Sequence, residues 1–233
     1  MTSSPADEQR TVARARSSLR HFHKPLNSGL FSRLLFAPCD RIIAISRFVA
    51  DLCERDGLPA RKVQVIYDSI DPQTFAEATP DAELSQRLAA LGEPRPVVVG
   101  HVSTLEHRKG CDVLLKAVAA AQSRLDQRLI VVLVGQKDGL WRPLVEELGL
   151  GEAVRFRDST PDVAGLLGAV DLLVHSSVAE GQPNAVLEGM ASGLPVVASS
   201  AGAAVALDDP AQQVPVGDVR AWAERVAALL RDP

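Results

Sequence analysis

Several marks of particular protein classes are missing from this 233-residue sequence. There are only three cysteines, Cys39, Cys53 and Cys111, and no CxxC pair, so a disulfide framework or a zinc site is not expected and the thiols should be reduced. A net charge of −4 gives no basic surface for nucleic acid. The longest apolar runs, such as residues 129–134, are far too short to cross a bilayer. The polar N-terminus does not resemble a secretory signal, and we expect a cytoplasmic location, with peripheral association at the inner membrane face as an alternative.

Motifs for the common cofactors are also missing. No GxxxxGK[ST] loop is present, and no GxGxxG follows a predicted strand, so ATP and NAD have no support. Neither HExxH nor another metal spacing occurs, and there is no GxSxG elbow. We therefore expect no metal and no resident cofactor.

The composition that is present suits a globular protein. Apolar residues make up 46% and charged residues 23%, which predicts a real hydrophobic core in one large or two small domains. Apolar strand segments alternate with helical segments from residue 97 to residue 199. That alternation is typical of a doubly wound parallel α/β sheet, in which ligands bind at the carboxyl ends of the strands. Gly100, Lys109 and Glu180 are all expected at that edge.

The stretch 180–199 organises the chain. A short apolar strand at 171–175 precedes it, and Pro183 suits the first turn of a helix. Gly193 is a helix stop and Pro195 opens the next strand. The expected inward stripe of this helix comprises Ala185, Val186, Leu187, Met190 and Ala191.

Two carboxylates in this stretch suggest chemistry. Glu180 lies before the helix and Glu188 lies inside it. A helix start binds anions, phosphate above all, and Gly181 lets a ligand approach the backbone. Each carboxylate can accept hydrogen bonds from a pair of neighbouring hydroxyls, so the stretch fits the sugar, diphosphate and ribose of a sugar nucleotide. The alternative is that Glu180 caps the helix and Glu188 is solvated.

The same stretch resembles glycosyltransferase family 4, the group 1 glycosyltransferases of the GT-B fold. The matching residues are Glu180, Glu188 and the run Gly193-Leu194-Pro195-Val196-Val197. The resemblance implies that Glu180 contacts the donor sugar and that Glu188 contacts the ribose. It also implies that the loop of Gly181, Gln182, Pro183 and Asn184 faces the sugar or the phosphates.

A second loop resembles the diphosphate loop of this family. Gly100 and the pair Lys109-Gly110 match it, and Lys109 is implied to neutralise the leaving diphosphate. His101 stands where the family usually has Arg. A neutral imidazole binds phosphate less well than a guanidinium does, so Arg108 is an alternative phosphate contact. Lys109 as a solvated loop residue and His101 as an ordinary packed histidine remain open.

The N-terminal part carries a weaker resemblance to the family's acceptor domain. A strand at 40–46, a helix at 47–56 capped by Ser46 and ended by Gly57, and a strand at 63–67 match it, but Asp68-Ser69 replaces the family's Asn-Gly. The pair Arg20-His21 matches an Arg-His pair that faces the catalytic cleft in some relatives, which would make His21 catalytic. The alternative is a solvated basic linker.

These patterns predict the organisation of the chain. We expect an arm, disordered or helical, at 1–20, a partial acceptor-type domain at 21–80, a connector at 81–96 and a Rossmann-like donor-binding domain at 97–233. The resemblance implies a retaining glycosyltransferase that uses a nucleotide sugar and an unknown sugar, lipid or polysaccharide acceptor. The alternatives are a truncated donor-binding module that depends on a partner chain or a homodimer, and a sugar-nucleotide epimerase of the same fold.

Overall fold

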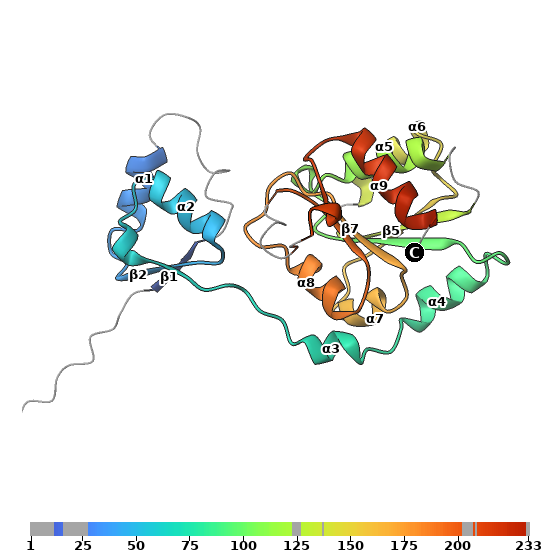
Figure 1. Ribbon diagram of the computed structural model, residues 1–233, viewed down its shortest axis with the longest axis horizontal. Helices are drawn as coiled ribbons and strands as arrows, with labels where there is room; N and C mark the ends of the chain where they lie inside the picture. Colours follow the sequence, from blue (N-terminus) through green and yellow to red (C-terminus); the bar gives the residue numbers. More distant parts are fainter. Residues whose placement is uncertain are drawn as a thin grey trace, which may run out of the picture. The chain divides into compact units, whose positions relative to one another are not determined.

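The chain divides into two compact units, Met1–Ser69 and Ile70–Pro233 (Figure 1). The computed structural model describes residues 12–15, 28–122, 127–136, 138–201, 207 and 209–231. The division falls before the boundary expected at residue 80. The reason is α3 (Pro72–Ala76), which contacts α7 (Val163–Leu167) and α8 (Asn184–Ala191) and so belongs to the second unit.

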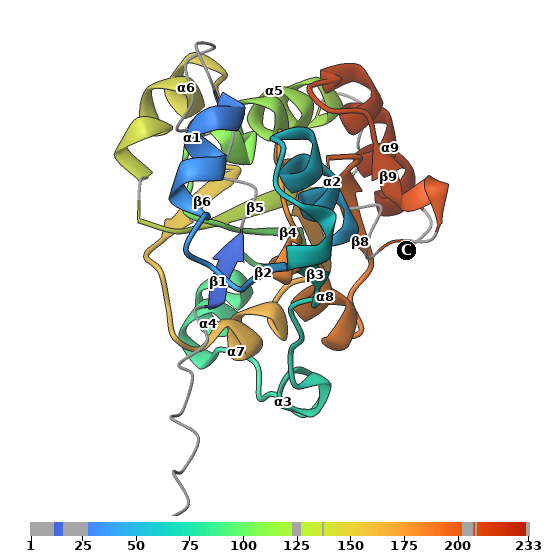
Figure 2. The ribbon, with the colours of Figure 1, turned by 90° about the vertical axis from the view of Figure 1, so that its left-hand side faces the viewer.

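The first unit is a parallel sheet of three strands, in the order β1 (Val12–Ala15), β2 (Arg41–Ala44) and β3 (Val63–Val65). The helices α1 (Ser28–Leu35) and α2 (Arg47–Arg55) lie on one side of it (Figures 1 and 2), and η2 (Ala60–Lys62) leads into β3. The expected cap is confirmed, because Ser46 Oγ accepts from Val49 N at 3.2 Å. The expectation of disorder or helix over 1–20 is wrong at β1, whose backbone pairs with β2.

The second unit contains a parallel sheet of six strands in the order β6-β5-β4-β7-β8-β9. The strands are β4 (Val97–Val102), β5 (Leu129–Val134), β6 (Val154–Arg157), β7 (Leu172–His175), β8 (Val196–Ser199) and β9 (Gln213–Val214). Numbered within this unit, the order is 3-2-1-4-5-6, that of a doubly wound dinucleotide-type sheet. The expected fold class is confirmed, and the topological switch point lies between β4 and β7.

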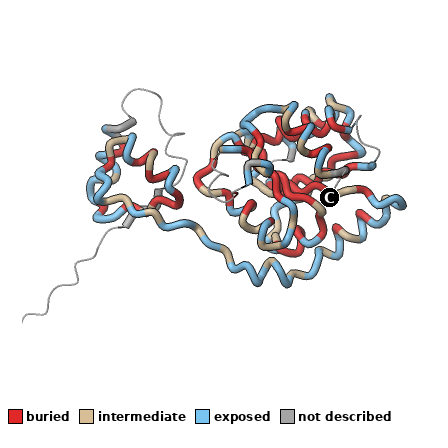
Figure 3. Tube along the Cα trace, in the orientation of Figure 1, coloured by how far each residue is buried: buried red, intermediate tan, exposed pale blue. Residues whose placement is uncertain are grey.

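Helices cover both faces of this sheet (Figure 1). One face carries α5 (Cys111–Gln122), α6 (Arg142–Glu147) and α9 (Val219–Arg231), and the other carries α4 (Ala82–Ala89), α7 and α8. The short helices are η3 (His107–Lys109), η4 (Asp138–Leu140) and η6 (Pro210–Gln212). Because both faces are covered, the central strands read as continuous apolar runs; every residue of β5 is buried (Figure 3).

The packing of the helices partly follows the expected stripes. In α9, Trp222 and Val226 are fully buried and form part of the core. In α8 the expected stripe is wrong at Met190, which is 47% exposed. Val186 of the expected stripe is buried, and Gly189 completes the buried face, because Gly189 lies so close to Leu173 of β7 that a Cβ would overlap its side chain.

Candidate functional site

A cavity of about 410 Å³ opens at the carboxyl ends of the strands, where the sequence placed the ligand. Its walls come from the segments that follow β4, β5, β6 and β7 and from the start of α8. The lining residues are Val102, Ser103, Thr104, Lys109, Val134, Gly135, Ser159, Thr160, Val163, His175, Glu180, Gln182, Pro183, Asn184, Ala185 and Glu188. One cavity therefore gathers side chains that are up to 86 positions apart, from Val102 to Glu188.

An ion pair between Lys109 and Glu180 lies in the wall of this cavity. Lys109 Nζ donates to Glu180 Oε1 at 2.5 Å, and both side chains are largely buried, at 13% and 8% exposed. The pair is held by the backbone. Val178 N donates to Arg108 O at 2.8 Å, and Ser176 Oγ donates to Gly110 O at 2.9 Å, so the loop carrying Lys109 is fixed against the loop carrying Glu180.

Glu180 is an ionised carboxylate at neutral pH. Burial alone would raise its pKa, but the imidazole of His175 and the ammonium of Lys109 hold the pKa of Glu180 at about 2. His175 Nε2 lies 3.4 Å from Oε1, the oxygen that Lys109 already occupies. On the other oxygen, the ion-pair contact found among the described residues is Arg108 Nη1 at 4.0 Å, which is beyond hydrogen-bond distance. Oε2 therefore has spare capacity to accept from a ligand hydroxyl.

His101 lies beneath the cavity rather than on its surface. It is fully buried, and its Nδ1 lies 3.1 Å from Val174 O while its Nε2 lies 3.1 Å from Ser103 Oγ. A carbonyl only accepts, so Nδ1 carries the proton and Nε2 accepts. Burial lowers the pKa of His101 to about 3, with His175 adding to the effect. His101 is thus a neutral structural group that cannot supply the charge of the Arg it replaces.

Glu188 lines the cavity from within α8. Burial raises the pKa of Glu188 from its ordinary value. The helix begins at Asn184 with Pro183 at its N-cap, one position earlier than the first-turn position expected, and Pro183 offers no side-chain cap. Asn184 and Ala185 both line the cavity, so the uncapped end of α8 faces the site, as expected for an anion-binding helix start.

The structure brings together most of the predicted donor-site residues. Those that line the cavity are Lys109, Glu180, Gln182, Pro183, Asn184 and Glu188. Four others contribute to its frame: Gly100 packs against Val170, Gly181 and His101 are buried, and Arg108 pairs with Glu106 at 3.1 Å. His21 lies outside the described residues. The roles given to all these side chains stay predictions at this point.

Sequence reasoning missed several lining residues. Ser103 and Thr104 follow β4, Gly135 follows β5, Ser159 and Thr160 follow β6, and His175 ends β7. The signal that could have found them is position alone, since each comes at the carboxyl end of a strand. Gly135 is required there, because a Cβ would overlap the carbonyl oxygen of Ser103.

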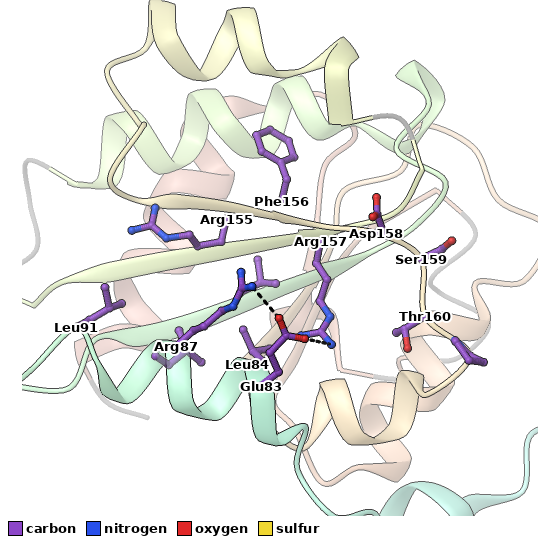
Figure 4. Close-up of a pocket in the computed structure, with 13 residues that line it drawn as sticks. Glu83, Leu84, Arg87, Leu91, Arg155, Phe156, Arg157, Asp158, Ser159 and Thr160 are labelled. Carbon is purple, nitrogen blue, oxygen red and sulfur yellow. Dashed lines mark ion pairs between the residues drawn. The ribbon is translucent and has the colours of Figure 1, made fainter.

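A second cavity, of about 760 Å³, lies between α4 and β6 (Figure 4). It is larger, but two of its lining cations are engaged in ion pairs: Arg87 pairs with Glu83 at 2.7 Å, and Arg157 pairs with Asp81, which lies outside the lining, at 2.6 Å. It lies at the sheet edge rather than at the switch point. We therefore place the functional site in the smaller cavity, where buried charge meets the strand ends.

Two findings bear on the expected cofactors and location. The residues that the structure describes contain no group of three or more His, Cys, Asp or Glu side chains placed to hold a metal ion. Within the same residues no helix has the length and apolarity needed to span a membrane. The expectations of a metal-free site and of a cytoplasmic or peripheral location stay predictions.

Comparison with known families decides the kinship of the chain. The family model for group 1 glycosyl transferases matches residues 96–232. The chain belongs to this family. The matched residues include every residue that lines the cavity.

Curated relatives show the same kinship over more of the chain. The D-inositol 3-phosphate glycosyltransferase of Salinispora arenicola is 34% identical over 215 residues, which covers 84% of this chain and 48% of the relative. That of Corynebacterium urealyticum is 34% identical over 198 residues, 79% of this chain and 46% of the relative. This group 1 chain thus spans about half the length of the curated relatives it matches.

Solved structures share the fold. Anabaena Alr3699/HepE, determined in complex with UDP-glucose, superposes with a TM-score of 0.81 at 25% identity, covering 96% of this chain and 63% of that one. Sucrose-phosphate synthase of Thermosynechococcus elongatus gives a TM-score of 0.73 at 22% identity, covering 95% and 59%. The GT-B-type, Rossmann-like fold expected from the sequence is confirmed.

Proposed function

We propose that the second unit binds a nucleotide sugar in the 410 Å³ cavity and that the protein is a retaining glycosyltransferase of the family 4 type. One observation carries the proposal. A buried lysine and two carboxylates, Lys109, Glu180 and Glu188, meet in one cavity at the switch point of the sheet. A cation suits a diphosphate, and two separated carboxylates suit the hydroxyls of a sugar and a ribose.

The three groups have different parts in this proposal. Glu180, ionised and with Oε2 available, accepts from hydroxyls of the donor sugar. Glu188 accepts from the ribose, and Lys109 stabilises the negative charge that grows on the leaving diphosphate. Lys109 does so from its pair with Glu180, so the diphosphate would share the ammonium rather than find it free. The proposal needs no metal or other cofactor.

The relatives support a nucleotide-sugar donor and suggest a first acceptor. Alr3699/HepE was solved with UDP and glucose, and the curated relatives are named for D-inositol 3-phosphate. We therefore propose UDP-glucose as the first donor and an inositol phosphate as the first acceptor to test. Other sugars, lipids and polysaccharides remain open as acceptors.

A second candidate is a donor-binding module that needs a partner. It is favoured by the first unit, in which the described residues form a sheet of only three strands. Transfer requires donor and acceptor in near-attack geometry with water excluded. Turnover measured beside light scattering would separate the candidates: transfer by a monomer supports an independent enzyme, whereas donor binding with activity only in a dimer or with an added chain supports the module.

Glu188 provides a direct test of donor binding. Glu188→Ala is expected to weaken binding of the nucleoside diphosphate by about 1.5–3 kcal/mol, the scale of hydrogen bonds to a charged group. Titration calorimetry with UDP, ADP and GDP measures it. The matched control is Glu152→Ala, a fully exposed glutamate in the turn before β6, which should leave affinity unchanged. Equal affinities of the Glu188 variant and the wild type would remove Glu188 from the ribose site.

A further inference from the structure

A histidine that the sequence did not single out occupies a particular place in the cavity. His175 is the last residue of β7, is only 2% exposed and lines the cavity beside Lys109 and Glu180. Neither of its ring nitrogens makes a hydrogen bond to any residue that the structure describes. The contact of Nε2 with Glu180 Oε1, at 3.4 Å, is close but not aligned as a hydrogen bond.

The contrast with His101 shows that this is a local feature. The two rings stack with centroids 6.3 Å apart and planes 19° apart. His101 uses both nitrogens, whereas His175 uses neither. Burying polar nitrogens without partners costs free energy, and such groups in a native protein call for a reason. His175 is therefore a buried hydrogen-bonding group whose two nitrogens make no hydrogen bond to the described residues, with the carboxylate of Glu180 as its charged neighbour.

The surroundings of His175 select the chemistry of its ligand. Glu180 next to it is ionised at neutral pH. A phosphate oxygen at this point would face that carboxylate and be repelled. A hydroxyl group can donate to one neighbour and accept from the other. Two adjacent hydroxyls would therefore satisfy Glu180 Oε2 and the ring of His175 together, which is the arrangement of a sugar ring.

We propose that His175 is a specificity-determining residue that, with Glu180, holds neighbouring hydroxyls of the donor sugar. This inference rests on the proposed function, since it names the part of a nucleotide sugar that reaches the end of β7. His175 touches the sugar and takes no part in bond cleavage. It should therefore affect recognition of the sugar and leave recognition of the nucleotide alone.

Three substitutions separate these effects. His175→Leu removes both nitrogens at similar size. His175→Gln keeps an amide nitrogen at the position of Nε2, the atom nearest Glu180, and His175→Asn places its amide nearer Nδ1. The probes are the glucose nucleotide that the wild type binds best among UDP-, ADP- and GDP-glucose, the matching nucleoside diphosphate, and deoxy analogues lacking one glucose hydroxyl each.

In calorimetry, His175→Leu is expected to weaken binding of the sugar nucleotide about 3–10-fold, the scale of one hydrogen bond. Binding of the nucleoside diphosphate should weaken by less than about twofold. His175→Gln should recover most of the loss and His175→Asn should not. One deoxy analogue should bind the wild type and the Leu variant equally, because it lacks the hydroxyl that His175 contacts. Tryptophan fluorescence confirms folding, and the Gln variant and the analogues keep the test valid if the Leu variant is unstable.

Two results would overturn the inference. Equal weakening of sugar nucleotide and nucleoside diphosphate would make His175 a structural or phosphate-facing residue. Unchanged sugar affinity in His175→Leu would exclude a contact. With either result the proposed donor binding would stand, because the wild-type chain would still bind the sugar nucleotide. If the wild type bound none of the nucleotides or sugar nucleotides, the proposed function itself would fail, and this inference with it.

Discussion

Replacing Lys109 by methionine is expected to lower the free energy of unfolding of the second unit by about 3–5 kcal/mol at pH 7. Methionine keeps the length of the buried chain but leaves the carboxylate of Glu180 without its cation in a site where it is 8% exposed. Denaturant unfolding followed by fluorescence measures the loss. Both tryptophans, Trp141 and Trp222, are buried in the second unit, so the signal reports that unit.

The pKa of Glu180 determines how the stability loss in Lys109→Met should change with pH. The folded pKa of Glu180, about 2, lies below the ordinary 4.5, so its stabilisation is present above pH 4.5 and is lost as the pH falls towards 2. In Lys109→Met we expect the pKa of Glu180 to rise. The difference in free energy of unfolding between the variant and the wild type should therefore narrow as the pH falls from 4.5 towards 2. If the difference in free energy of unfolding did not change with pH, the loss of stability could not be assigned to the pair of Lys109 and Glu180.

Two further variants isolate the buried pair. The double variant Lys109→Met with Glu180→Leu should recover much of the loss, because no buried charge remains. Lys116→Met breaks the half-exposed pair with Asp112 and should cost less than about 1 kcal/mol. If Lys109→Met cost no more than Lys116→Met, Lys109 would not be holding Glu180 in the folded protein.

Replacing Gly110 by alanine is expected to cost about 2–5 kcal/mol and to disturb ligand binding. Gly110 has φ +68°, a left-handed conformation that costs an alanine about 1–2 kcal/mol. In addition, its Cβ would overlap the carbonyl oxygen of Ser176, and relieving such a clash costs a further 1–3 kcal/mol or so. The shift would move Lys109, the preceding residue, away from Glu180.

The chain offers a matched control for this substitution. Gly149 has nearly the same φ, +67°, but a Cβ there would meet open space. Gly149→Ala should therefore cost only the conformational part, about 1–2 kcal/mol, and leave ligand binding unchanged. Tryptophan-monitored unfolding and calorimetry on both variants measure the difference. Equal losses would show that the close approach of Gly110 to Ser176 does not fix the site.

Much of the fold could be predicted because the local signals agree with the tertiary structure. Ser46 caps α2, Gly193 ends α8 with φ +72°, and the apolar runs of β4 and β5 became central strands. The sequence predictions failed where the structure depends on tertiary contacts. β1 (Val-Ala-Arg-Ala) is too short for its sequence to predict a strand and forms because β2 supplies backbone partners. Met190 is exposed because the small Gly189 lets α8 pack by another face.

The candidate site was predictable where a sequence pattern exists. Lys109, Glu180 and Glu188 stand in continuous motifs, and the structure places all three in one cavity. His175 has no such motif, because its position depends on β7 ending beside the loop of Lys109. The loop position of His101 suggests a phosphate contact, and only the structure shows that its ring is hydrogen-bonded to Val174 and Ser103.

The central claim is that this cavity binds a nucleotide sugar, and calorimetric titration of the whole chain with UDP-, ADP- and GDP-glucose tests it most directly. We predict saturable binding of one molecule per chain for at least one donor. Binding should weaken in Glu188→Ala and stay unchanged in Glu152→Ala. Absence of binding by the folded wild-type chain, or binding that Glu188→Ala does not weaken, would contradict the claim.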